Sequence, residues 1–305
     1  MDPTNSPVAQ PVERVAVNHQ VAGSSPAWGA KLFFCQPQFF PINVRLSNII
    51  CLKEDGMFKI TKVSIFLFVF AFFISCKSQA DKDYDELIKM INSDRCSDAI
   101  QFASKAIEKY PNDARFYYRR GYCYYDNKNL YNAKLDFANC IRIDPNFADG
   151  YYGLAIVFDE EEQYDLAEKN FNKAIEMAPN KIRKSIYISG LSSLFSRKKD
   201  YKKAIETIKK AIELNDEGYF YLKLGRYLFL DGQKQEAEKT WLKAVNEKKF
   251  TQIKFKQMTY AVLADYYFKE KDYKKSLENI EKAIELAPDN NLYIRFYNQI
   301  KLLAK

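Results

Sequence analysis

Two short runs of charged side chains have residue types that could bind a metal ion or an anion. Residues 159–162 read Asp-Glu-Glu-Glu, and carboxylate oxygens are the usual ligands of hard cations. Residues 196–203 read Ser-Arg-Lys-Lys-Asp-Tyr-Lys-Lys, and clustered basic groups can bind phosphate. Each run also has a simpler interpretation as a solvated turn, which we favour because charged side chains are mostly exposed. No carboxylate pair, nucleophile triad or glycine-rich phosphate loop stands out, so we expect no catalytic residue, no metal site and no cofactor.

Histidine and cysteine, the side chains most used in catalysis and zinc binding, are scarce. The only histidine, His19, lies in an N-terminal segment that is set apart below, so the rest of the chain lacks the usual general base at neutral pH. The six cysteines show no C-x-x-C spacing, which gives a zinc site no support. Three cysteines follow Cys76, and an odd number cannot all form disulfide bonds with one another. In an oxidising compartment, either one of these thiols stays reduced or all three stay unpaired. We interpret Cys96, Cys123 and Cys140 as buried packing residues.

Residues 57–76 have the order of a bacterial secretion signal. Lys59 and Lys62 form a positive start, residues 63–74 form an apolar run, and a small residue precedes Cys76. As a helix, the apolar run would measure about 18 Å, which is too short for a hydrocarbon core of about 30 Å. The run is therefore predicted to be the hydrophobic region of a signal rather than a membrane span.

Residues 73–76 resemble the bacterial lipobox, although Phe73 stands where leucine is usual. The resemblance implies that the signal peptide, residues 57–75, is removed and that Cys76 carries several lipid chains. Several chains anchor a protein stably, whereas a single chain gives only marginal attachment. Residues 76–83 would then form a short tether. The alternative is ordinary signal cleavage and release of the protein.

The first 56 residues are interpreted as translated non-coding DNA. Residues 9–14 and 23–26 can be encoded by sequences that resemble the D-arm and T-arm of a bacterial tRNA gene, at a spacing that suits those arms. We therefore predict that the natural product starts at Met57 and that residues 1–56 are a disordered upstream extension. A genuine disordered leader is the alternative.

The charge pattern does not indicate a nucleic-acid binder. The chain has 47 basic and 39 acidic residues, a net charge of +8, and both signs are interspersed along the predicted helices without a basic block. We therefore expect no nucleic-acid partner. The excess of basic residues could form a basic face that lies near an anionic surface. It could also belong to an ordinary solvated helical surface, which is the interpretation we favour.

Small residues recur with a period near 34 after Cys76. Their spacings are 34, 34, 37, 33 and 39 residues. In five of the six units a larger side chain follows four positions later, and in all six a second small residue follows seven positions later, so the three positions share one helix face. Such a period predicts an array of helix-turn-helix units in which small residues let two helices approach closely. Gly121 and Gly225, poor helix formers, indicate that a neighbouring helix packs against bare backbone. The recurring small residues are Ala99, Ala133, Ala167, Ala204, Ala237 and Ser276.

This order of aromatic, Leu-Gly, Tyr, Ala, aromatic, Ala and Pro residues resembles the tetratricopeptide repeat. The resemblance runs from about Asp81 to Asn290 and implies an all-α, right-handed superhelical solenoid with a C-terminal capping helix. The first leading helix fits loosely, the fourth unit has three extra residues near 182–184, and the fifth unit ends in a longer connection through 250–256. The expected units are about 84–113, 114–147, 148–181, 182–217, 218–256 and 257–290 (together the array, 84–290), followed by the capping helix 291–305.

The resemblance implies that a protein or peptide partner binds in the concave groove lined by the leading helix of each unit. Exposed aromatic and arginine side chains are enriched in binding surfaces, although each ring could instead pack against the adjacent unit. The lysine and asparagine clamp with which some members grip a terminal carboxylate is absent at the matching positions. The candidate groove residues are Arg115, Tyr118, Tyr122, Tyr125, Tyr152, Asp159, Tyr219 and Arg226.

Together these observations predict a non-catalytic scaffold for protein–protein interaction, carried by a lipoprotein of the bacterial cell envelope. Its expected location is the inner or outer membrane, facing the periplasm or the cell surface, with attachment through Cys76. The alternative is a peptide- or glycan-binding module for envelope assembly or nutrient uptake. An enzyme is a third class, which the residue types disfavour.

Overall fold

The computed structural model describes residues 78–93 and 95–304. The predicted upstream extension, the signal peptide and the lipidation site Cys76 therefore lie outside the described residues. Residues 78–82 and residues 83–304 belong to different compact units, and the contacts given below lie within the second. Among the helices described here, none combines the length and the apolar character that crossing a membrane requires.

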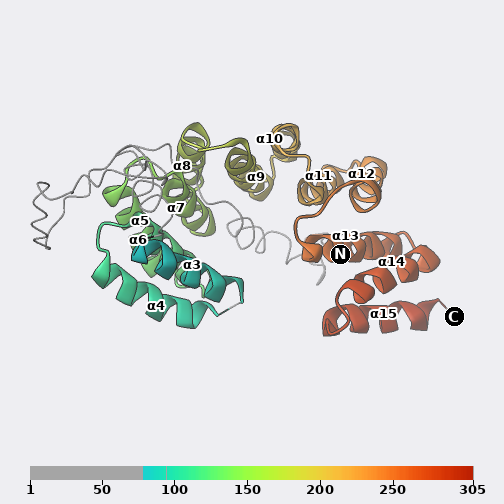
Figure 1. Cartoon of the computed structure of the whole chain (residues 1–305). Coiled ribbons are helices and arrows are strands. Elements are labelled where there is room, and N and C mark those ends of the chain that lie inside the picture. Colours follow the sequence, from blue (N-terminus) through green and yellow to red (C-terminus); the bar gives the residue numbers. More distant parts are fainter. Residues whose placement is uncertain (1–77, 94, 305) are drawn as a thin grey trace, which may run out of the picture. The chain divides into compact units, whose positions relative to one another are not determined.

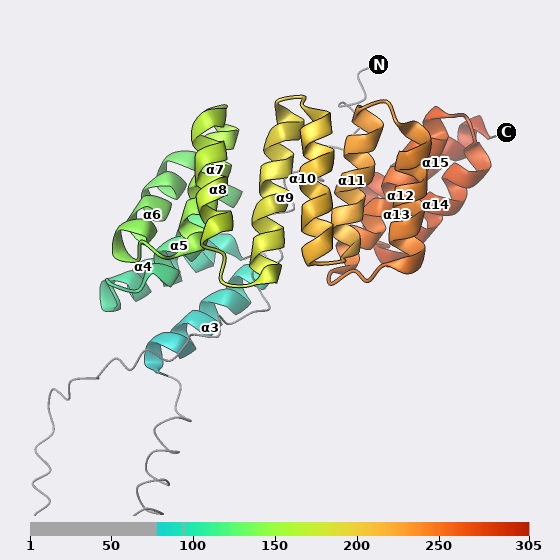
Figure 2. The same cartoon turned by 90° about the horizontal axis from the view of Figure 1, so that it is seen from above.

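Paired helices make up almost the whole of this region. Residues 78–93 and 95–304 contain thirteen helices and no strand beyond an isolated backbone bridge between Glu217 and Lys249. Figures 1 and 2 show helices α5 to α15 following one another in chain order, each pair beside the next. The predicted all-α solenoid is confirmed. The pairs are α3 (Gln79–Asn92) and α4 (Cys96–Lys109), α5 (Ala114–Asp126) and α6 (Leu130–Ile143), α7 (Ala148–Glu160) and α8 (Tyr164–Glu176), α9 (Lys181–Arg197) and α10 (Tyr201–Leu214), α11 (Gly218–Leu230) and α12 (Lys234–Glu247), α13 (Ile253–Lys269) and α14 (Tyr273–Leu286), followed by α15 (Asn291–Leu303).

The core of each pair lies between its two helices, where the repeated small residues stand. All six are fully buried, from Ala99 to Ser276, and the larger residues four positions on fill the space beside them. A methyl group added to Gly225 would meet the Trp241 indole, and one added to Gly121 would lie 3.0 Å from the Phe137 ring. Both glycines therefore allow the close approach of a neighbouring helix, as predicted.

The leading helices α5, α7, α9, α11 and α13 each end in the same tight turn. In α5, the N–H of Lys128 donates to the Tyr125 carbonyl at 2.9 Å and the N–H of Asn129 donates to the Tyr124 carbonyl at 2.8 Å, which is the Schellman pattern. This pattern needs one residue with a positive φ angle. The equivalent residues of the five turns have φ angles of 62°, 59°, 62°, 84° and 62°; they are Lys128, Glu162, Lys199, Gly232 and Lys271.

Gly232→Ala is expected to lower the free energy of unfolding by about 1 kcal/mol, because alanine is strained at this φ angle. No atom lies within 4 Å of the added methyl group, so the backbone alone is tested. The reverse change, Lys199→Gly, removes the same strain and is expected to leave stability equal or raise it by about 0.5 kcal/mol. Urea unfolding followed by circular dichroism measures both, and a stability loss in Lys199→Gly larger than that in Gly232→Ala would contradict the account.

Two leading helices are longer than expected. Both α9 and α13 contain 17 residues, whereas α5, α7 and α11 contain 13. The extra residues near 182–184 form the first turn of α9. Residues 253–256, predicted to lie in a connection, belong to α13 because Phe255 is buried against the Tyr219 ring, with 4.4 Å between ring centroids.

Helix α15 covers the end of the last pair. Tyr293, Phe296 and Ile300 are buried in a cluster with α13 and α14, whereas Arg295 and Gln299 are exposed. Its first turn is capped by Asn290, whose side chain accepts from the N–H of Leu292 at 3.0 Å.

Candidate functional site

The leading helices α5, α7, α9, α11 and α13 carry all the predicted groove residues and are called the leading row below. Direct packing joins α5 to α7, α7 to α9, and α11 to α13. The predicted residues on α5 are Arg115, Tyr118, Tyr122 and Tyr125, those on α7 are Tyr152 and Asp159, and those on α11 are Tyr219 and Arg226.

The tyrosines of this set are buried, so the expected exposure of their rings is not found. Tyr118 and Tyr219 are each 2% exposed, and Tyr152 is 5% exposed. The Tyr152 ring lies 5.7 Å from Phe171 in its own pair and 5.1 Å from Tyr187 in the next. The Tyr152 ring thus fills the space between adjacent units, which is the packing alternative. Tyr122 and Tyr125 are buried in the same way, at 2% and 6% exposed.

The two arginines are half-buried and differ in their surroundings. The Arg115 guanidinium donates to both carboxylate oxygens of Asp113, at 2.9 and 2.6 Å, and lies 4.8 Å from the centroid of the Tyr84 ring. Arg226 lies on α11, the fourth of the five helices of the leading row. Partner binding by the predicted set stays a prediction, and Arg226 is the member best placed to test it.

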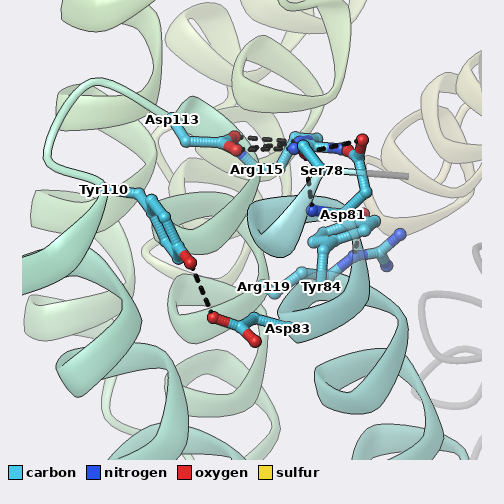
Figure 3. A network of polar contacts seen from close by, with 8 residues as sticks. All are labelled: Ser78, Asp81, Asp83, Tyr84, Tyr110, Asp113, Arg115 and Arg119. Atoms are coloured by element: carbon cyan, nitrogen blue, oxygen red, sulfur yellow. Dashed lines mark hydrogen bonds and ion pairs between the residues drawn. The ribbon is translucent and has the colours of Figure 1, made fainter. Parts of the chain in front are cut away.

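Figure 3 shows the side chains of two hydrogen bonds that hold α3, one from α5 and one from the end of α4. Arg119 Nε donates to the Tyr84 hydroxyl at 2.8 Å, and the Tyr110 hydroxyl donates to the Asp83 carboxylate at 2.8 Å. The loosely fitting leading helix α3 is therefore held to the array by specific side-chain contacts as well as by apolar packing.

The acidic run 159–162, at the end of α7, contacts side chains of the neighbouring leading helices α5 and α9. The Arg197 guanidinium on α9 lies 3.1 Å from the Asp159 carboxylate and 3.3 Å from the Glu160 carboxylate. The Tyr125 hydroxyl on α5 donates a hydrogen bond to the Glu160 carboxylate at 3.2 Å. Burial opposes ionisation of Glu160, but Arg197 and Lys128 hold the pKa of this carboxyl below its usual range. Among residues 78–93 and 95–304, no group of three or more Cys, Asp or Glu is arranged to hold a metal ion.

The basic run 196–203 covers the end of α9, the turn at 198–200 and the start of α10. The Lys203 ammonium lies 3.8 Å from the Asp200 carboxylate and 5.5 Å from the centroid of the Phe195 ring. The Lys198 ammonium lies 3.7 Å from the Glu168 carboxylate. Lys199 supplies the positive φ angle of the turn. The lysines of the run are exposed, and the ion pairs of Lys198 and Lys203 go to different carboxylates.

A buried lysine that the sequence did not single out connects α9 with α11. Lys223 is 1% exposed; its ammonium donates to the Ser189 carbonyl at 2.8 Å, to the Ser189 hydroxyl at 3.1 Å and to the Ser193 hydroxyl. The Tyr227 hydroxyl lies 3.2 Å from Ser192 Oγ. Two features of the sequence could have indicated this contact: a lysine stands within the apolar stretch 219–230, and serine is frequent in residues 185–196.

Comparison with known proteins identifies the repeats. The tetratricopeptide repeat family matches residues 114–147, 148–181 and 189–217, and a second tetratricopeptide repeat family matches residues 258–290. Anaphase-promoting complex subunit 3 of Schizosaccharomyces pombe is 28% identical over 121 residues, which are 40% of this chain and 18% of that protein. Protein O-mannosyl-transferase TMTC3 of Homo sapiens is 26% identical over 204 residues, which are 65% of this chain and 21% of that protein. The chain thus spans about a fifth of the length of these relatives.

A solved structure agrees with this result. The crystal structure of a tetratricopeptide repeat protein from Parabacteroides merdae is 13% identical and has a TM-score of 0.59, with 77% of this chain and 89% of that chain covered. At this identity the likeness concerns the fold alone. This chain therefore contains tetratricopeptide repeats, which build an all-α solenoid over the described residues.

Proposed function

We propose that this protein is a non-catalytic scaffold that binds a protein partner through its leading row. The observation that supports the proposal most is the repeat array itself, because stacked helix pairs of this kind present one continuous row of leading helices to a ligand. A relative named as a subunit of the anaphase-promoting complex has matching repeats, which is consistent with a role in protein assembly.

We place the scaffold in the bacterial cell envelope as a lipoprotein. The support is the sequence alone: the basic start, the apolar run of residues 63–74 and the lipobox-like residues before Cys76. Lipid chains on Cys76 would fix the protein to the inner or outer membrane, and residues 76–83 would separate the array from the lipid surface. The array would then face the periplasm or the cell surface.

A peptide- or glycan-binding module is the second candidate. Lys223 is not its binding group, because this lysine is 1% exposed and its ammonium already donates to the Ser189 carbonyl and to the hydroxyls of Ser189 and Ser193. An enzyme is the weakest candidate. One relative is named a mannosyl-transferase, but the alignment spans only 21% of that protein, so its activity is not carried over.

Co-purification of tagged protein from crosslinked membranes tests the scaffold proposal. Arg226→Ala is the informative variant, because the side chain is half-buried and its loss is not expected to unfold the array. The buried tyrosines are unsuitable, since truncation of a buried ring destabilises the fold by several kcal/mol and would mask a binding effect. The matched control is Tyr131→Ala on α6, outside the leading row, where the ring is 70% exposed.

The expected result is a stoichiometric partner whose recovery falls about tenfold with Arg226→Ala and stays unchanged with Tyr131→Ala. Both variants are first shown to be as helical and as stable as the parent. If recovery of the partner falls only with Tyr131→Ala, the partner binds the second helices of the pairs instead of the leading row. Absence of any partner would contradict the scaffold proposal and favour the binding module.

A further inference from the structure

Two leading helices carry an exposed isoleucine in their extra first turn. Ile182 on α9 is 51% exposed and Ile253 on α13 is 57% exposed. In the described part of the chain, these two are the large apolar side chains that the leading row exposes. Neither side chain belongs to the apolar core. Burial within the fold therefore does not explain an isoleucine at either position.

A single exposed apolar side chain is common, but here each one stands among basic residues without a carboxylate. Residues 181–184 contain two lysines and an arginine, residues 248–256 contain four lysines, and neither run contains Asp or Glu. Burial alone lowers the pKa of the half-buried Lys254 to about 8, and no carboxylate acts on it. A lysine in the first turn of a helix is unfavourable, because that end already carries partial positive charge. Stability of the fold thus does not account for these lysines.

Both first turns lie along the edge at which the leading helices start. In Figure 2 the connection from α8 into α9 lies at the lower edge, opposite the connection from α9 into α10. The start of α11 lies against the segment that leads into α13, because the N–H of Gly218 donates to the Lys249 carbonyl at 2.9 Å. Lys223 on α11 reaches the Ser189 carbonyl on α9 at 2.8 Å. The starts of α9, α11 and α13 therefore follow one another along one edge, called the start edge below.

The chain also enters the array at the start of a leading helix. Asp83, the last residue of the predicted tether, accepts a hydrogen bond at 2.8 Å from the hydroxyl of Tyr110, which stands just before α5. The ring of Tyr84 lies 5.9 Å from that of Phe116 in the first turn of α5. From Cys76 to Asp83 the chain advances by 83 − 76 = 7 residues. That length is at most about 25 Å of extended chain. Lipid chains on Cys76 would thus hold the edge at which the leading helices start close to a lipid surface.

We propose that the start edge of α9, α11 and α13 contacts an anionic lipid surface. The lysines would lie beside the lipid phosphates and the two isoleucines would enter the apolar boundary. The inference rests on the proposed attachment through Cys76 and adds a second contact to that anchor. Each basic residue near an anionic lipid surface raises binding about fivefold. The contact residues, called the basic edge below, are Lys181, Ile182, Lys184, Lys249, Ile253 and Lys254.

The arrangement of the basic edge favours a lipid surface as the binding partner. Its two isoleucines stand on different helices with α11 between them, and a broad layer of headgroups can meet such separated side chains at once. The opposite edge provides a comparison, because lysines there stand beside carboxylates. Lys203 lies 3.8 Å from Asp200, and Lys275 lies 3.2 Å from Asp272. The charge that could attract anionic lipid is therefore less compensated on the start edge.

Lipid photocrosslinking of the full chain tests the inference. A photoreactive amino acid replaces Ile182 in one sample and the exposed Lys202, on α10 at the opposite edge, in another. Both proteins are reconstituted into vesicles of phosphatidylcholine, alone or mixed with phosphatidylglycerol, and flotation checks their attachment. The anchor is the same in both, so the comparison reports which edge touches lipid. In the anionic vesicles, lipid crosslinking from position 182 is expected to exceed that from position 202 at least about fivefold.

Charge variants test the physical cause. Lys184→Gln/Lys249→Gln removes two charges of the basic edge and is expected to lower lipid crosslinking from position 182 about tenfold or more. The matched control, Lys202→Gln/Lys274→Gln, removes two lysines of the opposite edge and is expected to leave this crosslinking unchanged. All four side chains are exposed, so both variants should remain as helical as the parent by circular dichroism.

The outcomes separate this inference from the proposals on which it rests. Failure of the chain to float with the vesicles would contradict the attachment and the inference together. Flotation with equal crosslinking from positions 182 and 202, or with equal crosslinking from position 182 in neutral and anionic vesicles, would overturn the inference alone. Crosslinks from position 182 to a protein and none to lipid in intact cells would also overturn it and assign the basic edge to an acidic protein. Partner binding by the leading row is a separate question, since no predicted groove residue belongs to the basic edge.

Discussion

Arg120→Ala is expected to lower the free energy of unfolding by about 3 kcal/mol, the largest loss from any single ion pair described here. Arg120 on α5 donates to both carboxylate oxygens of Asp136 on α6, each at 2.8 Å, and to the Ser104 hydroxyl on α4 at 3.0 Å. The Asp136 side chain is only 4% exposed. Removal of Arg120 leaves a buried carboxylate without its cation, which costs far more than the loss of a surface pair. Urea unfolding followed by circular dichroism measures the difference.

The control is Arg95→Ala, whose ion pair with Asp98 is more than half exposed on both sides and is expected to contribute less than about 0.5 kcal/mol. Joint replacement of Arg120 by Met and Asp136 by Leu should restore most of the loss, since an apolar pair leaves no buried charge. Equal stability losses in Arg120→Ala and Arg95→Ala would contradict the account.

The same variant has an expected pH dependence. Burial raises the pKa of Asp136 even with Arg120 beside it. A carboxyl whose pKa is raised by folding destabilises the folded state above that pKa, and the cost disappears as the pH falls and the group binds a proton. Without Arg120 this cost grows. The difference between Arg120→Ala and the parent should therefore be larger at about pH 7 than at about pH 5.

Gly225→Ala is expected to have a similar effect, a loss of about 2 to 3 kcal/mol. The added methyl group would lie 2.5 Å from Cδ1 and 2.8 Å from Cε2 of Trp241, distances that force the indole to move. The indole N–H of Trp241 donates to the Leu222 carbonyl at 3.1 Å within the core, so its displacement also breaks a buried hydrogen bond. Thermal and urea unfolding measure the loss.

A second substitution distinguishes this steric cause from a general intolerance of alanine in α11. Trp241→Leu frees space beside the added methyl group, so the double variant should lose less than the sum of the two single variants. Gly121→Ala provides a graded comparison, because its methyl group would meet the Phe137 ring at 3.0 Å and a smaller shift would relieve the contact. A larger loss in Gly121→Ala than in Gly225→Ala would contradict the packing described here.

The repeated core was predictable because its signals are local. Alanine at Ala133, phenylalanine at Phe137 and a small residue at Cys140 share one helix face by spacing alone, and all three are fully buried. Helices α4, α6, α8 and α14 end two or three residues before a proline for an equally local reason, because proline has no backbone N–H; these prolines are Pro111, Pro145, Pro179 and Pro288.

The candidate site was less predictable because it depends on contacts between units. Position within a leading helix suggested exposure for Tyr118, but its ring is buried with the rings of Phe137 and Phe147, each 5.8 Å away between centroids. Lys223 was missed for the same reason, since its serine partners stand about 30 residues earlier on α9. The lysine turns were missed because positive φ angles favour glycine, and only the fold imposes them on Lys128 and Lys199.

The central claim is that a protein partner binds the leading row, and site-specific photocrosslinking tests it most directly. A photoreactive amino acid replaces Arg226 on α11 in one strain and the exposed Tyr131 on α6 in another, and both are irradiated in intact cells. The account predicts one discrete crosslinked partner from position 226 and none from position 131. Crosslinks from position 131 alone would contradict it.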